Sequence, residues 1–152
     1  MKIYLACTVR GDRAAVAALR EACVRLHAYG HDVLTAHLLQ DDVEAQEGSL
    51  SEREVYERDI AWLNACDALI ADASGSSYGV GFEVGYVLAR AARTGQHVYL
   101  VYDAARAGRI SRLITGVADE HCTTVAYASP ADLLAFIDRS FSGRSSSAGT
   151  SR

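Results

Sequence analysis

The chain has 152 residues, of which 50% are apolar and 22% charged, and its formal net charge is −4. This size and balance predict one globular domain with a buried core. A negative chain without a clustered basic face excludes a general nucleic-acid binder, and no apolar run is long enough to span a membrane. The four cysteines lack the spacing of metal ligands. We expect a cytoplasmic protein that needs no metal and no cofactor.

Strand and helix patterns alternate from the beginning of the chain. Residues Ile3–Cys7 form an apolar run typical of a strand, and apolar residues then recur at helical spacing from Val16 until Gly30 ends the pattern. A second strand is predicted over His31–Thr35. The polar stretch Gln40–Gly48 is predicted to be a loop.

The alternation continues to residue 141. Ser51 with Glu54 three residues later is a capping box that predicts the start of a helix, and Pro130 is typical of a first helical turn. Strands are predicted at 67–72, 97–102 and 122–127, and helices at 80–94, 110–117 and 131–141. Residues 1–141 are therefore expected to form the single domain, and the Ser-rich residues 142–152 a disordered tail.

Strands that alternate with helices predict an α/β fold with three layers, in which helices cover both faces of a five-stranded parallel sheet. The predicted order is 2-1-3-4-5, which is flavodoxin-like or Rossmann-like. In that order the switch point lies between the first and third strands. The loops 7–12 and 73–81 should meet there and form the site.

Two acidic residues stand out for catalysis. Glu83 follows the small-residue loop Ser76–Gly81 in the first turns of a predicted helix, where it is either a nucleophile or base, or an acid that stabilises the positive helix end. Asp59 shares a helical face with apolar residues. It is either a rim residue paired with an arginine, or a carboxyl in a partly desolvated cleft that is suited to donating a proton.

Several polar residues are candidates for substrate contacts. Thr8, Arg10 and Ser77 supply two hydroxyls and a guanidinium in the two converging loops, which is enough for one phosphate. Taken singly, each is also explained as a turn residue. Ser111 lies beside two arginines, where it either contacts phosphate or caps a short helix. His37 either lines the cleft or lies in a surface loop.

Three further residues belong to the predicted site. Gly79 and Gly81 allow close approach of the backbone to a ligand, although the full dinucleotide fingerprint is absent. Tyr4, in the first strand, is either a core aromatic or a functional hydroxyl.

With these residues in place, the chain resembles the nucleoside 2-deoxyribosyltransferase superfamily, and within it the 2'-deoxynucleoside 5'-phosphate N-hydrolases. The resemblance extends over nearly the whole chain up to Phe141. The segments that carry it are Ile3-Tyr4-Leu5, Thr8-Val9-Arg10-Gly11, Leu34-Thr35-Ala36-His37, Glu57-Arg58-Asp59-Ile60-Ala61-Trp62-Leu63, Ser77-Tyr78-Gly79-Val80-Gly81-Phe82-Glu83-Val84-Gly85 and Gly108-Arg109-Ile110-Ser111.

The resemblance implies a role for each matched catalytic residue. Glu83 falls on the glutamate that attacks the anomeric carbon. Asp59 falls on the acid that assists departure of the base, and Tyr4 on the tyrosine that supports the nucleophile and the sugar. The implied activity is hydrolysis of the N-glycosidic bond of (deoxy)nucleoside 5'-monophosphates to free base and (deoxy)ribose 5-phosphate.

The resemblance also implies how the phosphate is bound. Thr8, Arg10, Gly11, Ser77 and Ser111 fall on the phosphate-binding positions, and Val9 is expected to contact the substrate beside them. Thr8 stands where these hydrolases carry serine, so the hydroxyl is kept and a methyl is added. In this family the residue at the position of Ser111 comes from the partner subunit, which implies a homodimer.

Three other functions stay open at this point. A nucleoside 2-deoxyribosyltransferase would pass the sugar to another base and would have no use for a phosphate pocket. A ribonucleotide N-glycosidase of the cytidylate type would accept the 2'-hydroxyl. A nucleotide sensor without catalysis would bind the ligand on the same fold, although binding alone does not require paired acids.

Overall fold

The computed structural model describes residues 1–143, so nearly all of the predicted tail lies outside the described residues. The elements follow one another along the chain as β1 (Lys2–Ala6), α1 (Val16–Ala28), β2 (Asp32–Val33), the 3-10 helix η1 (Ala36–Leu39), α2 (Val43–Gly48), α3 (Glu52–Ala65), β3 (Ala68–Asp72), α4 (Tyr78–Thr94), β4 (His97–Asp103), the 3-10 helix η2 (Ala104–Arg109), α5 (Arg112–Thr115), β5 (Cys122–Tyr127) and α6 (Pro130–Phe141).

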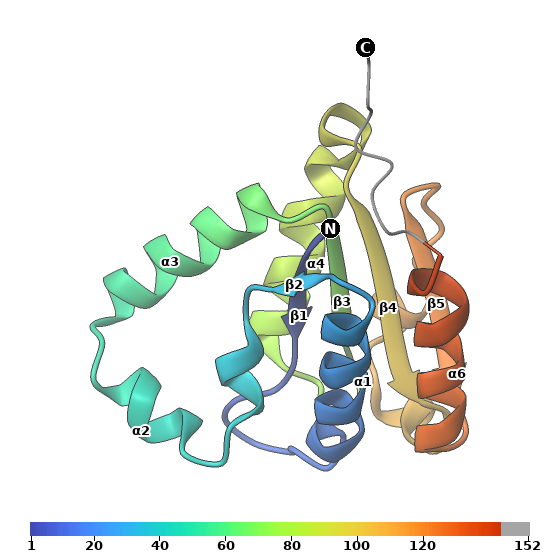
Figure 1. Cartoon of the computed structure of the whole chain (residues 1–152), viewed down its shortest axis with the longest axis horizontal. Coiled ribbons are helices and arrows are strands. Elements are labelled where there is room, and N and C mark those ends of the chain that lie inside the picture. Colours follow the sequence, from blue (N-terminus) through green and yellow to red (C-terminus); the bar gives the residue numbers. More distant parts are fainter. Residues whose placement is uncertain (144–152) are drawn as a thin grey trace.

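The five strands form one parallel sheet in the order β2-β1-β3-β4-β5, which confirms the predicted α/β fold (Figure 1). β1 pairs with β3 in a register that sets Tyr4 opposite Leu69. The carboxyl ends of β1 and β3 therefore lie side by side, and the loops that follow them meet at the switch point.

Helices cover both faces of the sheet. On one face, α1 and α6 pack over Ile3 and Leu5 of β1. On the other face, α4 and the carboxyl end of α3 pack over Tyr4. Because successive side chains of a strand point to opposite faces, β1 contributes to both cores and is buried from residue 3 to residue 6.

Local signals place several helix ends where the sequence predicts them. Ser51 and Glu54 make the reciprocal capping box of α3, and Gly95 ends α4 with a φ of 72°. Pro130 occupies the first turn of α6, whose cap is Ser129. These signals act within a few residues and do not depend on the rest of the fold.

Two predicted segments differ from the structure. The second strand has two residues rather than five. The reason is that the hydroxyl of Thr35 donates to the carbonyl oxygen of Leu5 at 2.7 Å and accepts the backbone N–H of Leu5 at 2.8 Å. The Thr35 side chain thus takes the place of the next backbone hydrogen bonds between β1 and β2. The segment predicted as a loop over Gln40–Gly48 contains α2, whose one buried residue is Val43.

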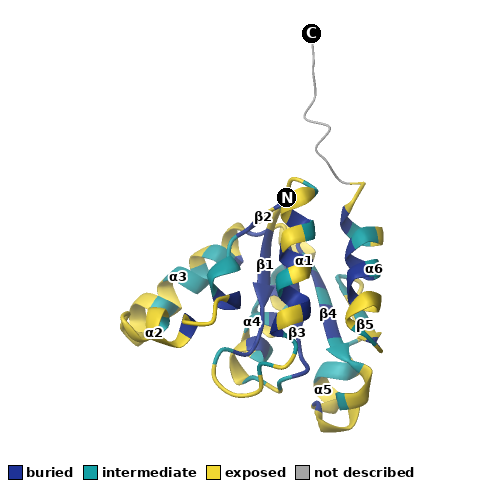
Figure 2. Cartoon of the chain, turned by 60° about the horizontal axis from the view of Figure 1, so that its bottom comes forward, coloured by how far each residue is buried: buried dark blue, intermediate teal, exposed yellow. Residues whose placement is uncertain are grey.

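α2 and α3 form an arm that projects from the sheet (Figure 1). Figure 2 shows that most of this arm is exposed or half-buried, in contrast to the strands. Within α3 the buried residue is Leu63, close to its carboxyl end. The amino-terminal part of the arm therefore rests on few apolar contacts.

No helix within residues 1–143 is both long and apolar enough to cross a membrane.

Gly75 lets the loop after β3 pass close to the loop after β1. A Cβ atom on this residue would lie 2.1 Å from Oγ1 of Thr8 and 2.9 Å from the carbonyl oxygen of Asp12. We predict that Gly75→Ala destabilises the protein by about 1–3 kcal/mol, because overpacking forces the backbone to move. Urea unfolding measures the change.

The matched control is Gly85→Ala in α4, where a Cβ meets no atom within 4 Å, and this variant should be neutral or slightly more stable. Equal losses in both variants would contradict the close approach.

Candidate active site

A short hydrogen bond joins β1 to α4 at the carboxyl edge of the sheet. The hydroxyl of Tyr4 donates to Oε1 of Glu83 at 2.6 Å, across 79 residues of sequence. Tyr4 is fully buried. Burial and the nearby Glu83 and Asp59 carboxyls all raise the pKa of Tyr4. The proton therefore stays on the tyrosine, and the direction of the hydrogen bond is fixed.

Glu83 lies in a desolvated position on α4. Burial raises its pKa to about 7, the Tyr4 hydrogen bond opposes this rise, and the Asp59 charge adds to it. A carboxyl with a pKa near neutrality changes its charge in the working range of most enzymes. Perturbed carboxyls in a cavity are typical of functional sites.

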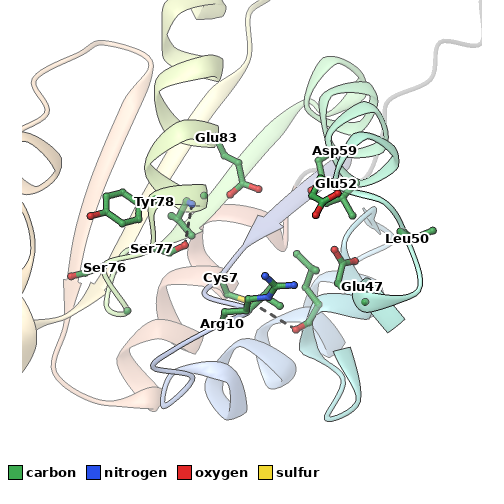
Figure 3. Close-up of a pocket in the computed structure, with 17 residues that line it drawn as sticks. Cys7, Arg10, Glu47, Leu50, Glu52, Asp59, Ser76, Ser77, Tyr78 and Glu83 are labelled. Atoms are coloured by element: carbon green, nitrogen blue, oxygen red, sulfur yellow. Dashed lines mark hydrogen bonds between the residues drawn. The ribbon is translucent and has the colours of Figure 1, made fainter. Parts of the chain in front are cut away.

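Asp59 and Glu83 line the same cavity, which has a volume of about 740 Å³. Figure 3 shows Glu83 on the α4 side and Asp59 on the opposite side, on α3. Ligand sites of drug-sized molecules occupy roughly 300–1,000 Å³, so a nucleotide fits this volume. Burial raises the pKa of Asp59 and the adjacent Arg58 lowers it, with a net rise.

The cavity brings together six of the twelve predicted site residues. Val9 and Arg10 reach it from the loop after β1, and Ser77 and Gly79 from the start of α4, beside the two acids. The hydroxyl of Ser77 caps α4 by accepting the N–H of Val80 at 3.5 Å. The amino end of a helix with a nearby guanidinium favours an anionic ligand.

The structure places the other predicted residues differently. Thr8 is buried, and within residues 1–143 its hydroxyl has no hydrogen-bond partner. Gly11 follows Arg10 with a φ of 119° and lies outside the cavity lining. His37 lies behind the lining, where Nε2 is 3.2 Å from Oε1 of Glu47 and the ring packs against Trp62.

Ser111 and Gly81 line a second cavity of about 400 Å³. It shares Ser76, Ser77, Tyr78 and Val80 with the first cavity, so the start of α4 separates the two. The hydroxyl of Ser111 accepts the N–H of Leu113 at 3.3 Å and caps α5. Within one chain, Ser111 therefore lies on the far side of this segment from the two acids.

Glu47, which lines the main cavity from α2, is not among the site residues predicted from the sequence. Arg58, its partner, is named only as part of the motif around Asp59. The two residues are 11 positions apart and join α2 to α3. α2 has six residues, which is too short for apolar periodicity to reveal it. No signal in the sequence predicts this pairing.

The described residues hold no group of three or more His, Cys, Asp and Glu side chains arranged to bind a metal ion. The cavity lining contains the carboxyls of Glu47, Asp59 and Glu83 and the donors of Arg10 and Ser77. The Tyr4 hydroxyl contacts Glu83 from outside this lining.

The sequence model of the nucleoside 2-deoxyribosyltransferase family matches residues 3–123. The chain belongs to this family. A protein of Thermofilum pendens named "Putative 2'-deoxynucleoside 5'-phosphate N-hydrolase 1" is 36% identical over 143 residues, which are 94% of this chain and 96% of that protein. The 5-hydroxymethyl-dUMP N-hydrolase of Mus musculus is 31% identical over 119 residues, which are 77% of this chain and 66% of the mouse protein.

A solved structure shares the fold at lower identity. The CMP N-glycosidase of Clostridium botulinum superposes with a TM-score of 0.66 at 16% identity, over 91% of this chain and 98% of the other. At this identity the match supports the fold alone.

The buried Glu83 carboxyl should lower the stability of the protein at high pH. Its pKa rises from an ordinary 4.5 to about 7 on folding, so the folded state holds the proton more tightly. Its contribution to stability is full below about pH 4.5 and is lost as the pH rises through 7. We predict that Glu83→Gln, which cannot ionise, gains about 3 kcal/mol over the wild type between pH 4 and pH 8.

Urea unfolding at several pH values measures this difference. The matched control is Glu57→Gln on α3, whose side chain is 57% exposed and should show no comparable gain. A constant difference between Glu83→Gln and wild type over this range would refute the raised pKa.

Proposed function

We propose that this protein is a nucleotide N-glycosidase that hydrolyses 2'-deoxynucleoside 5'-monophosphates to free base and deoxyribose 5-phosphate. The observation that carries the proposal is the Tyr4–Glu83 hydrogen bond at 2.6 Å in a cavity that Asp59 lines from the other side. Relatives that match over most of the chain are named for hydrolysis of such nucleotides, which favours deoxynucleotides over the CMP named for the more distant structure.

In the proposed first step, an oxygen of the Glu83 carboxylate forms a bond to the anomeric carbon of the sugar. The N-glycosidic bond breaks, its electron pair goes to the base, and Asp59 supplies the proton that the base takes up. In the second step water attacks the same carbon, the bond to Glu83 breaks, and Asp59 accepts the proton of the water. This division of roles between two carboxyls is that of retaining glycosidases.

Tyr4 orients the nucleophile in this proposal. Its hydroxyl occupies one oxygen of Glu83, which leaves the other oxygen for the sugar. Arg10, Ser77 and the amino end of α4 are assigned to the phosphate, because they supply positive charge and donors in one part of the cavity.

We further propose a homodimer in which Ser111 of the partner subunit contacts the phosphate. Large apolar side chains are exposed around the start of α4 and on α5: Tyr78 is 99% exposed, Phe82 53% and Leu113 82%. Of these residues, Tyr78 and Leu113 line the second cavity together with Ser111. Contact with a second copy would bury them and bring Ser111 across the subunit boundary.

Release of free base from a panel of substrates tests the function. We predict release from deoxynucleoside 5'-monophosphates and none from unphosphorylated nucleosides, since the phosphate site supplies binding energy for the reaction. Glu83→Gln should lose at least a hundredfold in kcat yet still bind nucleotide. Near-normal turnover in Glu83→Gln would show that Glu83 is not the nucleophile.

Other outcomes of the same panel would overturn the proposal in defined ways. Transfer of the sugar to an added base identifies a transferase, and preferential release from CMP identifies a ribonucleotide enzyme. Tight nucleotide binding by the wild type without release of base identifies a sensor.

Mixing two variants tests the shared site. We predict that Ser111→Ala loses roughly 10- to 100-fold in kcat/KM, the size of one hydrogen bond to a charged group. Mixed with inactive Glu83→Gln under subunit exchange, it should regain activity, because each mixed dimer has one site with both Glu83 and the partner's Ser111 intact. Native mass spectrometry confirms the exchange, and mixed dimers without recovered activity would contradict a shared site.

A further inference from the structure

One guanidinium on the arm connects two carboxyls of the active-site cavity. Nε of Arg58 donates to Oδ1 of Asp59 at 2.9 Å, and Nη2 lies 2.8 Å from the same oxygen. The other edge of the guanidinium faces Glu47, with Nη1 2.7 Å from Oε1 and Nη2 3.1 Å from Oε2. The planar fork of arginine suits such a double bridge, whereas a lysine ammonium does not.

The bridge is partly withdrawn from water. The side chain of Glu47 is 12% exposed and that of Arg58 is 21% exposed. The guanidinium carbon of Arg58 lies 4.9 Å from the centre of the Trp62 ring. A pair held this way is weakly screened, so each charge acts strongly on its neighbours.

We propose that Glu47 is a positioning residue for the reaction, an inference that rests on the proposed function. It acts through Arg58 to hold the Asp59 carboxyl against the cavity and to keep that carboxyl able to carry the proton for the departing base. The arm has few buried apolar residues, among them Val43 and Leu63. The bridge therefore supplies the fixed geometry that apolar packing does not.

The geometry leaves one oxygen of Asp59 for the proton. Oδ1 is engaged by Arg58, whereas Oδ2 makes no hydrogen bond with residues 1–143. A carboxyl that donates a proton must hold it on an oxygen that is not accepting from a cation. Arg58 thus selects which oxygen of Asp59 is protonated.

Glu47 offsets the charge of Arg58. An arginine beside a lone carboxyl favours the ionised form, which would deprive Asp59 of its proton. Burial is the main cause that raises the pKa of Asp59, Arg58 and His37 lower it, and Glu47 raises it. From the sheet side, Glu83 lines the same cavity with its own raised pKa, and Tyr4 lies behind it as its hydrogen-bond donor. Removing the Glu47 charge leaves Arg58 to act on Asp59 alone.

The first experiment uses the ligand-free protein. The Asp59 carboxyl carbon is followed by 13C NMR against pH in wild type, Glu47→Gln and Glu44→Gln. Glu44 lies on the same helix and is exposed, so its variant is the matched control. We predict that Asp59 titrates about one pH unit lower in Glu47→Gln, the low end of what one neighbouring charge produces, and as in wild type in Glu44→Gln. Overlapping titrations of all three would overturn the proposal.

The second experiment measures kcat with two leaving groups. With a natural base, Glu47→Gln should lose about tenfold, a part of what a general acid contributes, and the high-pH limb of its profile should move to lower pH. With a nitrophenyl 5-phosphodeoxyribose, whose leaving group needs no proton, the variant should match wild type. Equal losses on both substrates would mean a merely structural role and would overturn the proposal.

A double variant tests the route through Arg58. If Glu47 acts through Arg58, the combined Glu47→Gln and Arg58→Met changes should cost no more than the worse single change, whereas independent roles would add. Circular dichroism confirms folding of each variant. A wild type that releases no base would refute the proposed function, whereas the NMR titration judges the role of Glu47 by itself.

Discussion

The site depends on a single contact between the first strand and the helix that follows the third. Tyr4 reaches Glu83 because β1 and β3 are neighbours in the sheet and α4 crosses back over the face to which Tyr4 points. If β1 lay at an edge of the sheet, no side chain of its core face would meet α4 at this position. The order of the strands is therefore a condition for the chemistry as well as for the core.

The acids of this cavity are held at a cost to the fold. Burial of Glu83 penalises its charged form, so the ionised state that the proposed attack on the sugar requires is the less stable one in the empty cavity. In the proposed mechanism Asp59 faces the opposite requirement, since it would have to keep a proton beside the permanent cation of Arg58. The hydrogen bond from Tyr4 lowers the pKa of Glu83. Glu47 raises the pKa of Asp59 because its charge partly offsets that of Arg58. Each acid thus has one neighbour that shifts its pKa in the direction that its proposed role requires.

Signals within a few residues made much of the fold predictable. The Ser51–Glu54 capping box, Gly95 and Pro130 mark helix ends through local hydrogen bonds and backbone angles. Alternation then led to the sheet order and to the meeting of the two loops, and the resemblance to a family led to Tyr4, Asp59 and Glu83. What sequence could not supply was tertiary: the Thr35 hydroxyl that shortens β2, and the pairing of Glu47 with Arg58 across two helices. The burial of the Thr8 hydroxyl against Gly75 depends on a contact between loops more than sixty residues apart.

The two sides of the cavity are held in place by different interactions. The Glu83 side belongs to β1 and α4, where apolar packing is dense and Val80, Val84 and Val87 are buried. The Asp59 side belongs to the α2–α3 arm, most of which is exposed or half-buried (Figure 2). There the ion pairs of Arg58 with Glu47 and Asp59 add to few buried apolar residues. Elements with few buried contacts open at lower free energy than the core. The side that carries Asp59 is thus the side that opens at lower free energy, while Tyr4 and Glu83 are held by the dense packing of the other side. Substitutions on the arm should leave the Tyr4–Glu83 contact in place, because β1 and α4, and not the arm, hold that pair.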